Sequence, residues 1–163
     1  MNTVYRIDYK DLLEQRHLVL QYAISQCDYF SLITRQLKPY SRIPPHCLHD
    51  SELVSLLPQL KQQHVGIRSW SNNNASDNHT VMNVYSCTRA AVGILESLLF
   101  PELHQGPTDL CFYKGRTVWL STVTHEELAF LYLTSPGDLS FFLQAGIKCF
   151  NTAQMDAFVL PNL

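Results

Sequence analysis

The chain has 163 residues, of which 46% are hydrophobic and 16% are charged, and its formal net charge at pH 7 is −2. Proteins that bind nucleic acid or an anionic membrane need a basic face, and 12 Lys and Arg against 14 Asp and Glu do not supply one. The charged fraction is below the roughly 25% of a typical domain, so we expect a surface that either carries many Ser, Thr, Asn and Gln side chains or is partly covered by a partner.

The length predicts a single domain over residues 1–150 that buries about 70% of its unfolded surface, followed by a docked tail over residues 151–163. Apolar runs of about six residues are too short to span a bilayer. The first ten residues lack the apolar stretch of a secretory signal. The five cysteines are scattered without a C-x-x-C pair, which indicates free thiols. We therefore expect a cytoplasmic protein.

The N-terminal residues predict a strand, a helix and a second strand. Residues 4–7 are expected to form an edge strand. Asp8 is a suitable N-cap for a helix over residues 9–26, whose apolar residues form one stripe. Residues 29–34 are apolar and aromatic, which is typical of a strand.

A proline-rich connection follows over residues 36–49. It contains three prolines, which disfavour helix and favour extended geometry, and structureless connections of this length are often functional. Asp50 is expected to start a helix, and Pro58 should kink or split it because the proline ring clashes with the preceding turn.

The middle of the chain predicts a long hairpin. Residues 65–70 and 81–87 read as two strands joined by the polar sequence SNNNASDNH. Thr88 is expected to cap a further helix that Pro101 ends.

The most regular pattern lies between Asp109 and Phe150. Residues 110–113, 117–123 and 128–133 form three apolar runs with short polar breaks, which predicts a β-meander with a tight turn at Lys114-Gly115. The third run does not alternate, so we expect both of its faces to be covered.

A helix and a short strand complete this region. Ser135 is a suitable N-cap, Pro136 suits the first helical position, and Gly146 is well placed to end the helix before a strand over residues 147–150. Together these patterns predict an α+β single domain, in which a mainly antiparallel sheet (a hairpin plus the C-terminal β-meander) is packed by about four helices.

The candidate contact surfaces are residues 39–49 of the proline-rich connection and residues 70–79 at the hairpin tip. Between them and the adjoining Arg68 they contain the aromatic, Arg and Asn residues that are typical of protein interfaces and adaptable binding loops. The predicted binding residues are Tyr40, Arg42, Ile43, Arg68, Trp70, Asn72 and Asn73.

Two other groups of residues are candidates for a metal site and for a catalytic site. His46, Cys47 and His49 have the ligand types of half a zinc site, although the sequence shows no matching second pair. His125, Glu126 and Glu127 place a possible general base beside two acids in a turn, but the pattern is not H-E-x-x-H because position 129 is Ala.

These residues predict a small intracellular binding protein without catalytic activity, cofactor or metal. It would act on another protein, or on a second copy of itself, by occlusion or sequestration, as immunity, antitoxin or regulator proteins do. The alternatives are a hydrolase or metal-dependent enzyme using His46 and His49, or His125 and Glu126, with zinc as the candidate cofactor, and a small-ligand-binding domain. Neither nucleic acid nor a membrane is an expected partner.

Overall fold

The computed structural model describes residues 2–35, 54–74, 80–98, 108–152 and 156–161. The helices and strands, in chain order, are β1 (Val4–Ile7), α1 (Tyr9–Glu14), α2 (Arg16–Gln26), β2 (Tyr29–Arg35), the 3-10 turn η1 (Leu57–Gln59), β3 (Leu60–Val65), β4 (Ser69–Trp70), β5 (Asn73–Asn74), β6 (Thr80–Ser86), α4 (Ala91–Leu98), β7 (Thr108–Lys114), β8 (Thr117–Val123), the 3-10 turn η2 (Thr124–Glu126), β9 (Leu128–Tyr132), α5 (Pro136–Gln144) and β10 (Cys149–Asn151).

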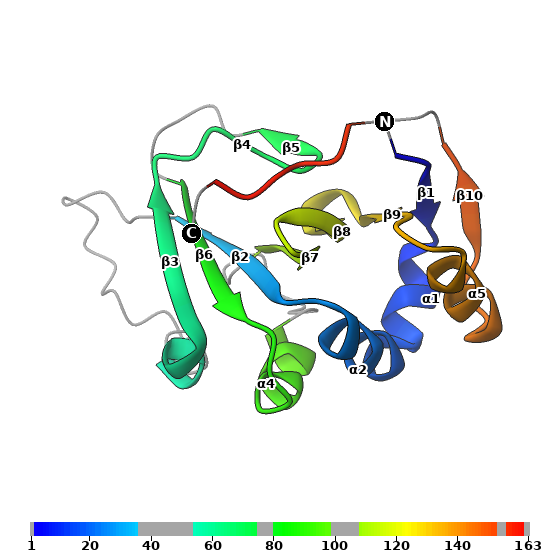
Figure 1. Ribbon diagram of the computed structural model, residues 1–163, viewed down its shortest axis with the longest axis horizontal. Coiled ribbons are helices and arrows are strands. Elements are labelled where there is room, and N and C mark those ends of the chain that lie inside the picture. The colour runs from blue at the N-terminus through cyan, green and yellow to red at the C-terminus, as the bar shows by residue number, and fades with distance from the viewer. Residues whose placement is uncertain (1, 36–53, 75–79, 99–107, 153–155, 162–163) are drawn as a thin grey trace.

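An eight-stranded sheet organises the molecule (Figure 1). Its strand order is β10-β1-β9-β8-β7-β2-β6-β3. Every neighbouring pair in this sheet is antiparallel. The predicted α+β class with a mainly antiparallel sheet is therefore confirmed.

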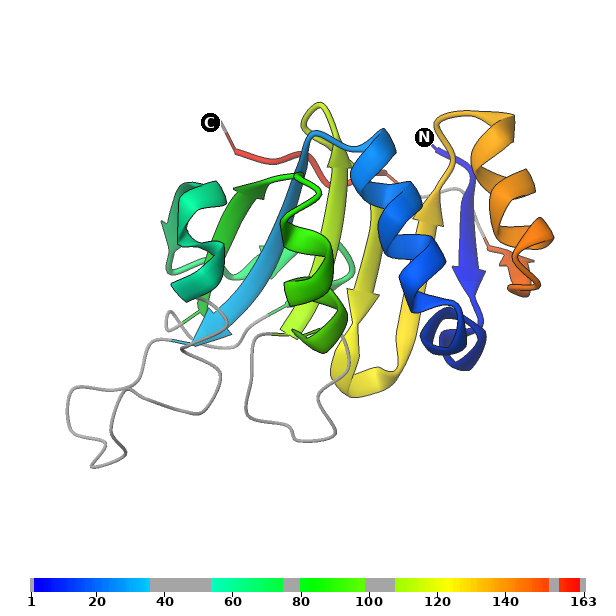
Figure 2. The same ribbon diagram turned by 90° about the horizontal axis from the view of Figure 1, so that it is seen from below.

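The helices cover one face of this sheet (Figure 2). Leu12, Leu20 and Leu95 from the helices meet Phe30 and Phe112 from the strands in a helix-side core. Since side chains alternate between the faces of a strand, the residues between these strand positions point to the opposite face.

The opposite face carries a second core. The β4–β5 hairpin and the C-terminal segment, residues 156–161, cover this core (Figure 1). The buried residues of the second core are Val4, Ile33, Trp70, Met82, Val84, Cys111, Tyr113, Val118, Tyr132 and Leu160. Burial on both faces explains why strands such as β9 read as unbroken apolar runs.

The C-terminal segment pairs with the start of β8. The Val118 N–H donates to the Phe158 carbonyl at 2.9 Å, and the Leu160 N–H donates to the Arg116 carbonyl at 2.8 Å. Arg116 also donates to the Leu160 carbonyl through its guanidinium. Leu160 is completely buried, whereas its neighbour Val159 is 53% exposed.

Three predicted elements differ from the structure. Residues 4–7 do not form an edge strand, because β1 lies between β9 and β10. The helix predicted over residues 9–26 breaks at Gln15, whose φ of −101° and ψ of 14° end α1 before α2 begins. The predicted hairpin pairs residues 60–65, not 65–70, with β6.

Two local predictions are confirmed. Gly115 has a φ of 57° in the turn between β7 and β8, where a left-handed backbone favours glycine. Helix α5 begins at Pro136, and the Ser135 N–H donates to Oδ2 of Asp138 at 3.0 Å.

Among the described helices, none has the length and apolar character needed to traverse a bilayer.

Candidate functional site

Six predicted site residues lie outside the described residues, in the stretch 36–53. They are Tyr40, Arg42, Ile43, His46, Cys47 and His49. Their roles in partner contact or zinc binding therefore stay predictions.

Trp70, which we expected to contact a partner, is buried, with 6% of its surface exposed. Its ring belongs to the second core, and its Nε1–H donates a 2.9 Å hydrogen bond to Oδ2 of Asp109. The other carboxylate oxygen of Asp109 accepts a 2.9 Å bond from the Thr124 N–H. The prediction that Trp70 contacts a partner is therefore wrong. Trp70 packs in the second core and connects the β4–β5 hairpin to the sheet.

The other predicted residues of this hairpin have different environments. Arg68 is exposed, and Asn73 pairs with Trp70 in the ladder of β4 and β5. Asn72 is half-buried, and its Nδ2 donates to Oγ of Ser121 at 3.4 Å. Arg68 therefore has the exposure that a contact residue needs.

Backbone strain surrounds the bond between Trp70 and Asp109. Ser71, Asp109 and Glu127 have φ values of 42°, 53° and 53°, in the left-handed region that costs a non-glycine residue about 1–2 kcal/mol. Such residues persist where the surrounding contacts determine them. The hydrogen bonds of Asp109 to Trp70 and Thr124 therefore connect β4, β7 and the start of η2.

His125, Glu126 and Glu127 lie together on the turn between β8 and β9. His125 Nε2 is 3.7 Å from Oε1 of Glu126, and both side chains are 56% exposed. Glu127 ends η2 with its left-handed backbone. The three residues are close in space because they are adjacent in sequence, and their predicted catalytic role stays a prediction.

The described cysteines are free thiols, as expected from their spacing. Burial raises the pKa of Cys27 and of Cys111 to about 12 and that of Cys149 to about 11, and it also raises the pKa of Cys87. Because a nucleophilic cysteine needs its thiolate, these thiols are poorly suited to attack at neutral pH.

Among the described residues, no three His, Cys, Asp or Glu side chains are grouped to hold a metal ion.

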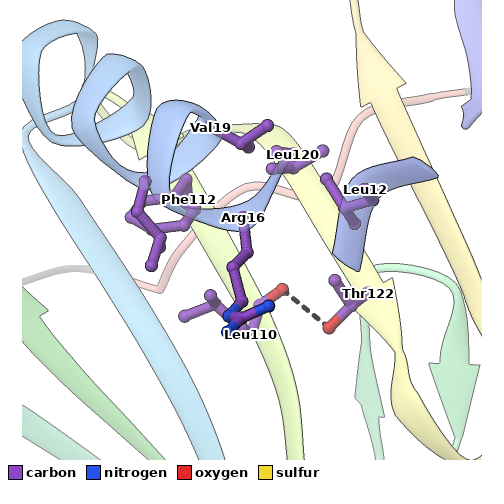
Figure 3. Close-up of a pocket in the computed structure, with 8 residues that line it drawn as sticks. Leu12, Arg16, Val19, Leu110, Phe112, Leu120 and Thr122 are labelled. Atoms are coloured by element: carbon purple, nitrogen blue, oxygen red, sulfur yellow. Dashed lines mark hydrogen bonds between the residues drawn. The ribbon is translucent and has the colours of Figure 1, made fainter. Parts of the chain in front are cut away.

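A cavity of about 10 Å³ lies between the α1–α2 junction and the sheet (Figure 3). Its walls are apolar except for Arg16 and Thr122, and the Thr122 hydroxyl already donates to the Leu110 carbonyl at 3.2 Å. Arg16 donates to the Leu13 carbonyl at 3.2 Å. A volume of about 10–15 Å³ holds a single water, so this cavity has no room for a larger ligand. The small-ligand alternative places its pocket beneath the proline-rich connection, outside the described residues, and stays a prediction.

Strand β3 ends the sheet at the side opposite to β10, and no described strand pairs with its outer edge (Figure 1). The Gly66 N–H donates to the Thr80 carbonyl at 2.9 Å. Backbone groups in an antiparallel ladder face the neighbouring strand at every second residue. His64 and Gln62 therefore point their backbone groups at β6, whereas Val65 and Gln63 point theirs outward.

Exposed apolar side chains lie at both ends of this edge. Val54 and Leu57, just before β3, are 59% and 54% exposed, and Val65 at its end is 60% exposed. Lys61 is the one charged residue of the strand, and it occupies a shift in the pairing between Leu60 and Gln62. Natural sheet edges are commonly protected by charges, prolines or bulges, and residues 62–65 have none of these.

The sequence of β3 gives little indication of a strand. Residues 60–65 read LKQQHV, which lacks a β-branched or aromatic run, and the bulge at Lys61 interrupts the alternation. Pro58 is the available signal, because a proline interrupts the helix expected to begin at Asp50 and a strand can then begin after it.

Comparison with models of protein families, with curated proteins and with solved structures finds no match to this chain.

Proposed function

We propose that this protein is a binding protein without catalytic activity, and that it acts by adding a strand of another polypeptide to the outer edge of β3. Strand addition gives affinity through backbone hydrogen bonds and specificity through alternate side chains. The observation that supports the proposal is the outward direction of the Gln63 and Val65 backbone groups at the end of the sheet.

Such pairing fits a protein that works by occlusion or sequestration, in the manner of an immunity protein, an antitoxin or a regulator. A bound strand continues the sheet, so it needs no cavity. The apolar side chains of Val54, Leu57 and Val65 flank the edge and would be covered by the bound polypeptide.

The test is a photo-cross-linking amino acid placed at Lys61 in the full chain inside cells. A covalent adduct with a polypeptide is expected, and it should disappear when Val65→Pro is added, since proline removes the outward N–H that strand addition requires. The matched control is the same cross-linker at Leu143, which is 55% exposed on α5 and distant in sequence from this edge. An adduct at Lys61 that persists with Val65→Pro, or no adduct there, would refute strand addition at β3.

A further inference from the structure

We infer that protonation of His64 detaches β3 from β6, which makes β3 an acid-sensitive element of the fold. If the proposed function holds, on which this second step rests, detachment also releases the polypeptide bound at the outer edge of β3. Acid would then regulate binding at that edge, whichever polypeptide is bound there.

His64 lies on the face of β3 that continues the second core. It is directly opposite Met82 of β6, and directly opposed side chains share one face of a sheet. Met82 and Val84 are completely buried, and Thr80, the next β6 residue on this face, is 1% exposed. The β6 surface that His64 faces therefore carries no charge.

One nitrogen of the His64 ring has no hydrogen-bond acceptor. Nε2 is shielded from solvent by the chain itself and has no partner among the described residues. A neutral imidazole carries a proton on one nitrogen, whereas an imidazolium donates from both. Protonation at Nε2 would therefore bury a charged N–H without an acceptor, which costs free energy unless the side chain reaches water.

Gln62 does not relieve this cost in the folded arrangement. It lies two residues before His64 on the same face of β3, and its Oε1 is also shielded and without a partner. The two side chains are thus close along the strand, yet the Gln62 carbonyl accepts no bond from His64.

Neighbouring charges do not compensate the imidazolium either. β3 and the two segments that cover this face contain three charged residues, Lys61, Arg68 and Asp156, and all three are exposed. Burial is the cause that lowers the pKa of His64 below its ordinary value of 6.5. Because the detached strand binds the proton more tightly, the pairing of β3 with β6 is fully stable above pH 6.5 and weakens as the pH falls below it.

The position of β3 makes it the element that this proton releases. Among the described strands β3 pairs with β6 alone, so its detachment breaks one ladder, whereas detachment of β1 would break two. The irregular pairing between Leu60 and Gln62 already interrupts the β3–β6 ladder. Detachment exposes the imidazolium to water without unfolding the rest of the sheet.

Amide hydrogen exchange of the purified full chain at pH 7.5 and pH 5.5, followed by NMR, tests this inference. The amides of Gln62 and His64 point at β6 and report the opening of this pairing. After correction for the intrinsic exchange rates, their opening equilibrium should rise up to about tenfold at the lower pH, where a histidine with its ordinary pKa is mostly protonated. Amides of β8, inside the sheet, should not show this rise.

Two matched variants identify the responsible group. His64→Gln removes the titrating ring and should abolish the rise. His17→Gln removes a histidine whose side chain is 60% exposed on α2, and it should keep the wild-type response. A rise that persists in His64→Gln, or no rise in the wild-type chain, would overturn the inference. If His64→Gln does not fold, an NMR titration of the wild-type His64 ring decides, and a midpoint at or above pH 6.5 would overturn it.

Gln62→Leu tests the competing possibility that the imidazolium is accepted by Gln62. In that case acid would slow the exchange of the wild-type β3 amides, and Gln62→Leu would remove the slowing. This result would overturn the inference. A rise in Gln62→Leu at least equal to that of the wild type would support it.

Failure of this inference is distinguishable from failure of the proposed function. Exchange at β3 that depends on His64, in a chain that gives no adduct at Lys61, would refute strand addition and leave the acid-sensitive strand standing. The converse result, an adduct at Lys61 with exchange at β3 that does not change with pH, would refute the acid sensitivity alone.

Discussion

Asp138 is a completely buried carboxylate at the start of α5. It accepts hydrogen bonds from Nζ of Lys114 at 2.8 Å, from the Thr134 hydroxyl at 2.9 Å and from the Ser135 N–H at 3.0 Å. Because Lys114 lies in the β7–β8 hairpin, this ion pair connects the hairpin to the helix. Lys114 Nζ also lies 5.2 Å from the centre of the Trp119 ring.

Replacing Lys114 with methionine should destabilise the protein by about 3 kcal/mol, because it leaves the buried carboxylate without its cation. Urea unfolding at pH 7 measures the change. The control is Lys148→Met, whose pair with Asp11 spans 3.4 Å and whose side chain is 67% exposed. An exposed pair contributes about 0–1 kcal/mol, so equal effects of the two variants would contradict a structural role for Asp138.

The effect of Lys114→Met should also depend on pH. Burial by itself raises the pKa of Asp138, but the hydrogen bonds from Lys114 and Thr134 outweigh it and hold the pKa below its ordinary value of 3.8. A carboxylate with a lowered pKa stabilises the fold above pH 3.8, and this contribution is lost as the pH falls through its folded-state value. The difference in unfolding free energy between wild type and Lys114→Met should therefore narrow in acid. A difference in unfolding free energy between the two proteins that stays constant down to pH 2 would contradict this role of Asp138.

Trp70 allows a test of the bond to Asp109. Trp70→Phe keeps an aromatic ring in the second core but removes the Nε1–H, which leaves a buried carboxylate oxygen without that donor. The expected loss of stability is about 1–3 kcal/mol, measured by urea unfolding. An unchanged unfolding free energy would show that this bond does not hold the hairpin. Had Trp70 been a surface contact, the substitution would have left the stability unaffected.

The C-terminal segment illustrates how an element far along the chain completes a core. Leu160 fills the second core and Val159 faces outward, as the alternation of a strand requires. The sequence alone indicated that this apolar segment would be unfavourable in solvent. It did not identify β8 as the strand with which the segment pairs.

Leu160→Ala should destabilise the protein by about 3 kcal/mol, because it leaves a cavity beneath the segment. Val159→Ala, at the adjacent exposed position, should change the stability by no more than about 0.5 kcal/mol. Thermal and urea unfolding of both variants provide the comparison. Similar losses at the two positions would contradict the alternation seen in the structure.

The N-terminal elements show where prediction from the sequence fails. Asp8 was correctly identified as a cap, and its carboxylate accepts the Asp11 N–H at 3.0 Å. The central position of β1 could not be predicted, because it depends on Ile7 pairing with Ala129 on one side and with Cys149 on the other. Such distant pairs leave no periodic signal in a local stretch of sequence.

For the whole molecule, strand addition at β3 would link stability to the concentration of the bound polypeptide. A polypeptide that binds only the folded chain stabilises the folded state by mass action. The melting temperature of the wild-type chain should rise with the concentration of the polypeptide identified by cross-linking at Lys61, whereas that of Val65→Pro should not. Differential scanning calorimetry measures this, and equal shifts for the two proteins would contradict binding at this edge.

The sequence by itself determined the α+β class, the turn at Gly115, the start of α5 at Pro136 and the burial of β9. Each of these depends on a few consecutive residues whose backbone preferences or apolar runs act locally. Only the tertiary structure decided that Trp70 is buried against Asp109, that β1 lies inside the sheet and that β3 forms its edge. These outcomes depend on free energies of contact between residues far apart in the chain, which become favourable only when the sheet has assembled.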